Sequence, residues 1–74
     1  MSNNISNVLE YKGFIGSIEA DTNADILYGH VQNLKNQNDV VSYEGETIKE
    51  LRNDFHEAID DYLASFDKET SKEN

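Results

Sequence analysis

The chain contains no cysteine and no long apolar run. Without cysteine it can form neither a disulfide framework nor a thiolate nucleophile, and a cysteine-based metal site is excluded. A membrane-spanning helix needs roughly 18 or more consecutive apolar residues, and no segment approaches that length. The first seven residues, MSNNISN, also lack the charged and apolar regions of a secretory signal. We therefore expect a soluble, cytoplasmic protein that does not contact a membrane.

Basic residues are scarce. The chain has 6 Lys and Arg against 15 Asp and Glu, which gives a formal net charge of -9. Because nucleic-acid binding depends on Lys and Arg that displace counterions from phosphates, we expect no direct nucleic-acid binding. The same negative charge attracts basic proteins and accelerates their approach. A chain of 74 residues also has a thin core with little room for a deep pocket, which favours a binding protein over an enzyme.

Alternation of apolar and polar residues indicates strands in the first part of the chain. Three runs have this character: residues 8–20, 26–31 and 40–44. Gly13 and Gly16 favour a bulge or bend within the first run. A polar turn at residues 21–25 makes the first two runs an antiparallel hairpin, and a polar loop at 33–39 precedes the third.

An amphipathic helix follows, from Thr47 to Phe66. Its apolar residues recur at spacings of three and four and form one stripe: Ile48, Leu51, Phe55, Ile59, Tyr62, Leu63 and Phe66. Thr47 and Glu50 have the spacing of a capping box, in which each side chain accepts a hydrogen bond from the backbone N–H of the other residue.

This order predicts an α+β fold, in which a three-stranded antiparallel sheet (β-β-β) is covered on one face by one amphipathic helix. Residues 8–66 would form the domain, flanked by flexible polar tails at 1–7 and 67–74. Because an open sheet edge exposes unpaired backbone groups, a homodimer formed through such an edge would add stability.

The polar side of the helix is the candidate partner-binding surface. It carries five carboxylates: Glu50, Asp54, Glu57, Asp60 and Asp61. Asp60 and Asp61 lie in the C-terminal half of the helix, where negative charge opposes the helix dipole. Glu57 and Asp61 are like charges four residues apart, which repel each other. This accumulation of repulsion makes the surface a candidate for meeting a basic partner, although a solvated acidic surface is the commonest role of such a run.

No other pattern indicates a cofactor, a metal or a catalytic site. His30 and His56 lack the spacing of paired metal ligands, and His56 is instead placed to interact with Asp60 one helical turn later. The glycines do not form a phosphate-binding motif. Paired carboxylates could still belong to a vestigial metal-dependent nuclease, for which RNA cleavage lost on Asp60→Asn would be the evidence.

Four segments together resemble the N-terminal domain of HicB-like antitoxins. They occur in the family's order and near its usual spacing: Leu9–Glu19, Leu27–Val31, Val41–Thr47 and Glu50–Leu63. The resemblance implies a degraded RNase H-like fold that binds HicA, a small basic mRNA-cleaving toxin, and covers the toxin's active site. Family members usually continue into a C-terminal DNA-binding domain and often carry another strand after the helix. Neither feature is predicted here.

The expected function is therefore that of an antitoxin. An alternative of a different class is a stand-alone acidic inhibitor, for instance one encoded by a phage, that occupies the basic groove of a nucleic-acid-handling defence complex. The fold and charge suit both functions equally. A small basic HicA-like reading frame beside the gene would favour the first, and phage genes beside it would favour the second.

Overall fold

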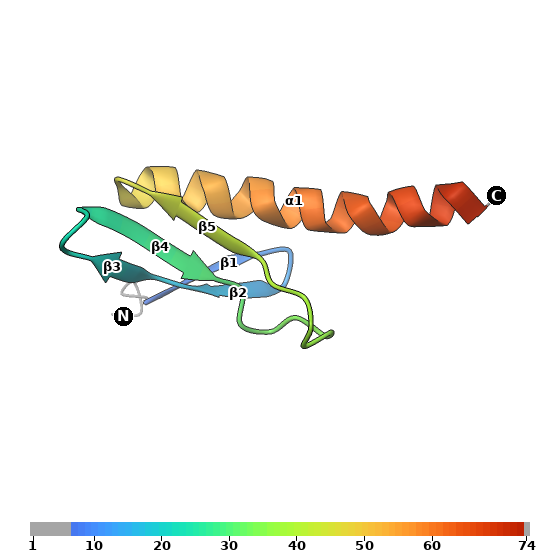
Figure 1. Ribbon diagram of the computed structural model, residues 1–74, viewed down its shortest axis with the longest axis horizontal. Helices are drawn as coiled ribbons and strands as arrows, with labels where there is room; N and C mark the ends of the chain where they lie inside the picture. Colours follow the sequence, from blue (N-terminus) through green and yellow to red (C-terminus); the bar gives the residue numbers. More distant parts are fainter. Residues whose placement is uncertain (1–6, 74) are drawn as a thin grey trace, which may run out of the picture.

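A computed structural model describes the backbone of residues 7–73 and the side chains of residues 7–66. Its elements are β1 (Val8–Tyr11), β2 (Phe14–Ser17), β3 (Glu19–Asp21), β4 (Ile26–His30), β5 (Ser42–Gly45) and α1 (Ile48–Glu73). The predicted α+β class is confirmed, with antiparallel strands on one side and a single long helix on the other (Figure 1). The N-terminal tail predicted at 1–7 lies outside the described residues, apart from Asn7.

The prediction of one long strand over residues 8–20 is wrong, because the chain reverses direction within this segment. Lys12 and Gly13 both have positive φ, 53° and 85°, and connect β1 to β2. Positive φ at both central residues is the signature of the two-residue turn whose twist matches that of a hairpin. Tyr11 therefore pairs with Phe14 instead of continuing an extended strand. The result is an additional strand at the edge, not a bulge.

The remaining strands form the sheet that the sequence predicts. The order is β3-β4-β5, and both pairs are antiparallel. The two-stranded sheet of β1 and β2 is joined to it, because Gly16 forms a bridge with Val31 and the Gln32 N–H donates to the Ile15 carbonyl at 2.7 Å. β2 and β3 thus lie in line beside β4, interrupted only at Ile18. The edges of the whole arrangement are β1 and β5.

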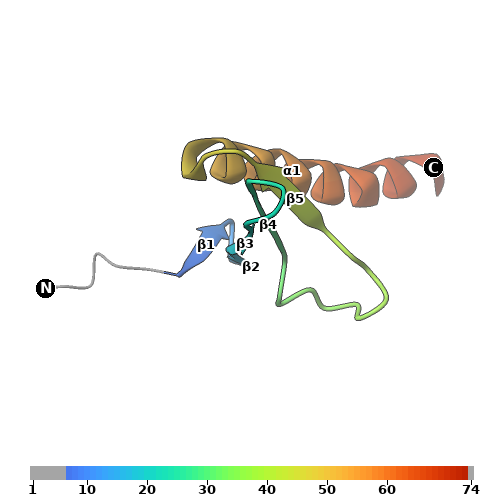
Figure 2. The same ribbon diagram turned by 60° about the vertical axis from the view of Figure 1, so that its left-hand side comes forward.

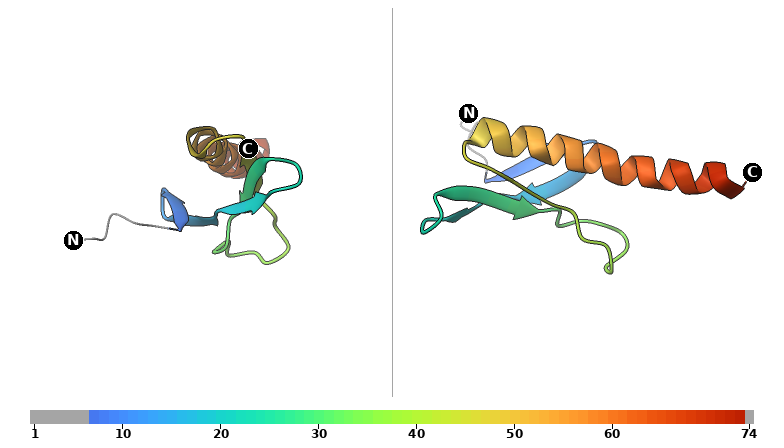
Figure 3. Two further views of the ribbon diagram at one scale, coloured as in Figure 1. Left: turned by 90° about the vertical axis from the view of Figure 1, so that its left-hand side faces the viewer. Right: turned by 45° about the horizontal axis from the view of Figure 1, so that its top comes forward.

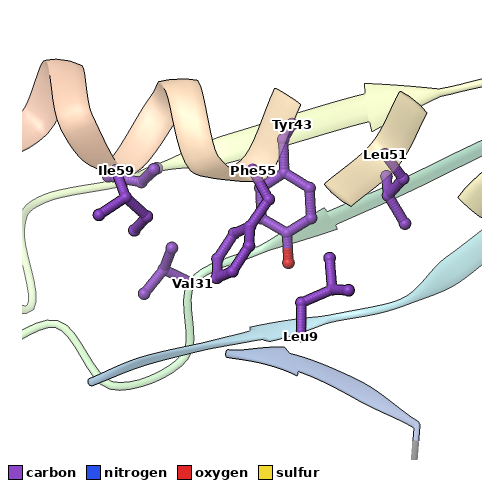
Figure 4. Packing of buried hydrophobic residues seen from close by; sticks show 7 residues of the cluster. Leu9, Val31, Tyr43, Leu51, Phe55 and Ile59 are labelled. Carbon is purple, nitrogen blue, oxygen red and sulfur yellow. The ribbon is translucent and has the colours of Figure 1, made fainter. Parts of the chain in front are cut away.

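The helix covers one face of these strands and packs mainly on β5 (Figure 2). Its stripe supplies the most deeply buried side chains, Leu51, Phe55 and Ile59, each 0% exposed. They meet buried residues from the strands and the adjoining loops: Leu9, Val31, Val41 and Tyr43. Figure 4 shows Leu9, Val31 and Tyr43 gathered around Phe55. No described element covers the opposite face of the strands.

Tyr43 shows how two small residues shape this core. Its ring lies 4.9 Å from that of Phe55, and its buried hydroxyl donates to the Ser17 carbonyl at 2.7 Å. A Cβ at Gly16 or at Gly29 would collide with the Tyr43 hydroxyl, and at Gly29 also with the Ser17 carbonyl. Burial raises the pKa of the Tyr43 hydroxyl above its ordinary value. The two glycines therefore make the space that Tyr43 occupies.

The helix begins as predicted but extends further. The backbone N–H of Glu50 donates to Thr47 Oγ1 at 3.1 Å, which confirms half of the capping box. The other half differs, because Glu50 Oε1 accepts from the N–H of Glu46 at 2.9 Å and not from that of Thr47. α1 continues to Glu73, through most of the segment predicted as a tail, so its C-terminal part projects past the strands (Figure 3). No helix among the described residues is long and apolar enough to span a membrane.

The Thr47 cap should have a measurable effect on stability. Thr47→Ala removes the acceptor of the Glu50 N–H, and the loss of such a cap costs about 1 kcal/mol. We expect a urea-unfolding free energy lower by about that amount, whereas Thr47→Ser, which keeps the hydroxyl, should unfold like the wild type. Equal destabilisation by both substitutions would show that the methyl group, not the hydrogen bond, matters.

Candidate protein-binding surface

The five predicted carboxylates lie on the solvent side of α1 but do not act as one group. Successive residues of an α-helix are separated by about 100°, so four of them share one flank, on the side of β5. These four define the acidic stripe: Glu50, Asp54, Glu57 and Asp61. Asp60 lies on the other flank, on the side of β1, where it meets Lys12.

Two residues of the acidic stripe have structural partners. Glu50 accepts the hydrogen bond from Glu46 that completes the helix start. Asp54 Oδ2 accepts from the backbone N–H of Glu44 at 2.9 Å and so connects the helix to strand β5. Glu50 and Asp54 therefore contribute negative charge to the surface while they also hold the helix in position.

Asp60 is paired within the molecule, which the sequence does not reveal. Its carboxylate forms an ion pair with Lys12 Nζ at 2.9 Å and accepts from the Tyr11 hydroxyl at 3.1 Å. The Lys12 hydrogen bond is the main cause that lowers the pKa of Asp60, and the same hydrogen bond raises the pKa of Lys12. The predicted partner of Asp60, His56, instead stacks on the Tyr11 ring with centroids 4.0 Å apart. Asp60 is therefore less available to a partner than predicted.

Glu57 and Asp61 form the C-terminal half of the acidic stripe. Both are exposed, and neither forms a hydrogen bond or an ion pair with any side chain that the structure describes. One helical turn separates them, so their charges repel. The backbone of Glu44 on β5 lies beside the stripe at Asp54, but because Tyr43 faces the helix, the exposed side chain of Glu44 points to the uncovered face of the sheet. The sequence does not reveal that Glu44 and Asp54 are close, because this depends on how the helix packs.

The Lys12–Asp60 pair predicts a specific pH dependence. Because the folded pKa of Asp60 is lowered, its contribution to stability is present above the unfolded pKa of about 3.9 and is lost as pH falls through the folded value. Lys12→Met should therefore lower the urea midpoint at pH 7, and the gap to the wild type should close in strong acid. Lys35→Met, which removes an exposed Lys outside this pair, controls for net charge. A gap that is the same at both pH values would contradict this role.

A second feature is an apolar groove between the β1–β2 turn, the 33–39 loop and the helix. Its volume is about 460 Å³, and the residues that line it include Phe14, Tyr62 and Leu63 together with Lys12 and Lys35. Asp39 in the same loop accepts from the Tyr62 hydroxyl at 2.7 Å, which holds the loop against the helix. The described residues that line the groove include no convergent set of catalytic groups.

A serine, a glutamate and a histidine also meet on the uncovered face of the sheet. Ser17 Oγ donates to Glu19 Oε2 at 3.0 Å, and His30 Nδ1 lies 3.5 Å from each of these two oxygens. A catalytic triad requires the serine hydroxyl to donate to the histidine, whereas here it donates to the carboxylate. Ser17 is also buried, so the arrangement is that of a structural hydrogen-bond cluster.

The described residues offer no group of three His, Cys, Asp or Glu side chains that could hold a metal ion. The paired carboxylates of the helix thus have no ligand from a second described segment beside them.

Comparison of this chain with protein-family models, with curated proteins and with solved structures gives no match.

Proposed function

We propose that this chain is an antitoxin that binds a small basic mRNA-cleaving toxin of the HicA type and covers its active site. The observation that carries the proposal is the acidic stripe, with Glu57 and Asp61 exposed in its C-terminal half. An RNA-cleaving protein needs basic residues to hold phosphates, so its active site is the part of it that an acidic surface attracts most strongly.

Two further features support binding over plain solubility. Glu57 and Asp61 are like charges one helical turn apart, so their repulsion reduces helix stability unless a cation compensates. A basic partner would supply that cation. The four segments that resemble HicB-like antitoxins also span most of the domain, from Leu9 to Leu63. Because the proposed substrate of the toxin is mRNA, the proposed place of action is the cytoplasm.

The test is co-expression in bacteria with the small basic reading frame expected beside the gene. We expect the toxin alone to arrest growth, and co-expression of this chain to restore growth and to give a complex that co-purifies. Phe55→Ala, which disrupts the core, should restore neither growth nor complex formation. Growth arrest that persists despite full expression of the folded wild type would contradict the proposal.

A further inference from the structure

Strand β5 leaves one edge of the sheet open. Val31 N–H donates to the Val41 carbonyl, and the same pairing continues at Gly29 with Tyr43. Because the backbone groups of alternate residues in an antiparallel strand point to opposite sides, those of Ser42 and Glu44 point away from β4. The contact of the Glu44 N–H with Asp54 on the helix confirms this direction.

The open part of this edge is centred on Ser42. The Glu44 N–H already donates to Asp54. Neither the N–H nor the carbonyl of Ser42 has a hydrogen-bond partner among the described residues. Val40, just before the strand, is 81% exposed, the highest value among the large apolar side chains described. An unpaired N–H and carbonyl beside an exposed β-branched residue are the features that accept an added strand.

The charge around the edge determines which strand fits. A strand added beside β5 would lie about 4.8 Å away, alongside the acidic stripe and next to Glu44. A second copy of this chain would bring its own Glu44 and stripe to the same place, and like charges across paired strands are destabilising. An extended segment with Lys or Arg at alternate positions would instead form ion pairs there.

We infer that β5 binds an extended basic segment of the protein partner by strand addition at residues 40–44, with the acidic stripe receiving its Lys and Arg side chains. The inference deepens the proposed function, on which it rests, by specifying how the basic partner is held. Backbone hydrogen bonds at Ser42 supply the pairing, and Glu57 and Asp61 select for positive charge.

The probe is a short peptide of alternating Lys and Val with blocked ends, titrated into the isotope-labelled full chain and followed by NMR. We expect the largest shifts at residues 40–44 and slower hydrogen exchange of the Ser42 amide. The same peptide N-methylated at every residue, which leaves no N–H on either edge, should bind at least about fivefold more weakly, as the loss of one hydrogen bond implies. Shifts confined to β1 or to the apolar groove, or no binding at all, would overturn the inference.

Two substitutions at the edge, each with a control, test strand addition by changing the protein instead of the peptide. Ser42→Pro removes the outward N–H and should weaken peptide binding about fivefold or more, whereas Ser42→Ala keeps the N–H and should bind normally. If Ser42→Pro is misfolded by circular dichroism, Val40→Lys replaces it, because that exposed side chain can change without affecting the core. Val40→Lys should repel the peptide, and Val40→Thr is its control. Wild-type affinity in a folded edge variant would contradict strand addition.

The outcomes for the two proposals are separable. If the toxin is neutralised equally by the wild type and by the edge variants, strand addition fails while the proposed function stands. If no toxin binds but the peptide pairs at Ser42, the proposed function fails and the edge remains a site for a basic segment. Protection of Ser42 that grows with protein concentration, without peptide, would overturn the inference in favour of a homodimer.

Discussion

Phe55→Ala is expected to remove most of the stability of this domain. Phe55 is 0% exposed and packs against the rings of Tyr43 and Tyr11, with centroids at 4.9 Å and 6.5 Å. Truncating a buried Phe costs about 3–5 kcal/mol. Small domains typically have only about 5 kcal/mol in total, so a large fraction of the variant should be unfolded at 25 °C.

Circular dichroism during urea titration would measure this effect. Ile48→Ala is the matched control, because Ile48 belongs to the same apolar stripe but is 46% exposed, and its loss should cost much less. A cooperative transition for Phe55→Ala within about 1 kcal/mol of the wild type would show that the core is not centred where the structure places it.

Glu57→Lys combined with Asp61→Lys is expected to weaken binding of the basic partner by more than about tenfold, which corresponds to roughly 1.4 kcal/mol. Both side chains are exposed, so the fold should be unaffected. The substitutions replace attraction by repulsion in the C-terminal half of the acidic stripe, and the effect should shrink as salt screens the charges. Isothermal titration calorimetry at two salt concentrations would measure both changes.

The control for this prediction must change charge elsewhere. Glu10→Lys reverses an exposed charge on β1, at the opposite edge of the strands from the stripe, and can be compared with the single Glu57→Lys variant. Glu10→Lys should have little effect on affinity. Equal losses from Glu10→Lys and Glu57→Lys would mean that net charge alone, and not the stripe, attracts the partner.

The helix and its cap were predictable because they depend on near neighbours in the sequence. The spacing of Leu51, Phe55 and Ile59 encodes one buried stripe, and those three side chains are the most deeply buried. The β1–β2 hairpin was missed for a physical reason. Lys12-Gly13 is not one of the residue pairs that strongly signal a two-residue turn, and apolar alternation continues across it.

The candidate site was only partly predictable. Helical periodicity places all five carboxylates outside the core, but it does not show which of them already have partners. Asp60 pairs with Lys12, 48 residues away in sequence, and Asp54 accepts from Glu44, 10 residues away across the sheet edge. Such contacts depend on how the helix packs on the strands, and among the five carboxylates they leave Glu57 and Asp61 without a partner in the described part of the chain.

Neutralisation is tested most directly by cleavage of mRNA by the purified toxin with increasing amounts of this chain. We expect one equivalent of the folded chain to stop cleavage, and the variant with both Glu57→Lys and Asp61→Lys to require a large excess. Cleavage that continues at full rate in the presence of a large excess of the folded wild-type chain would contradict it.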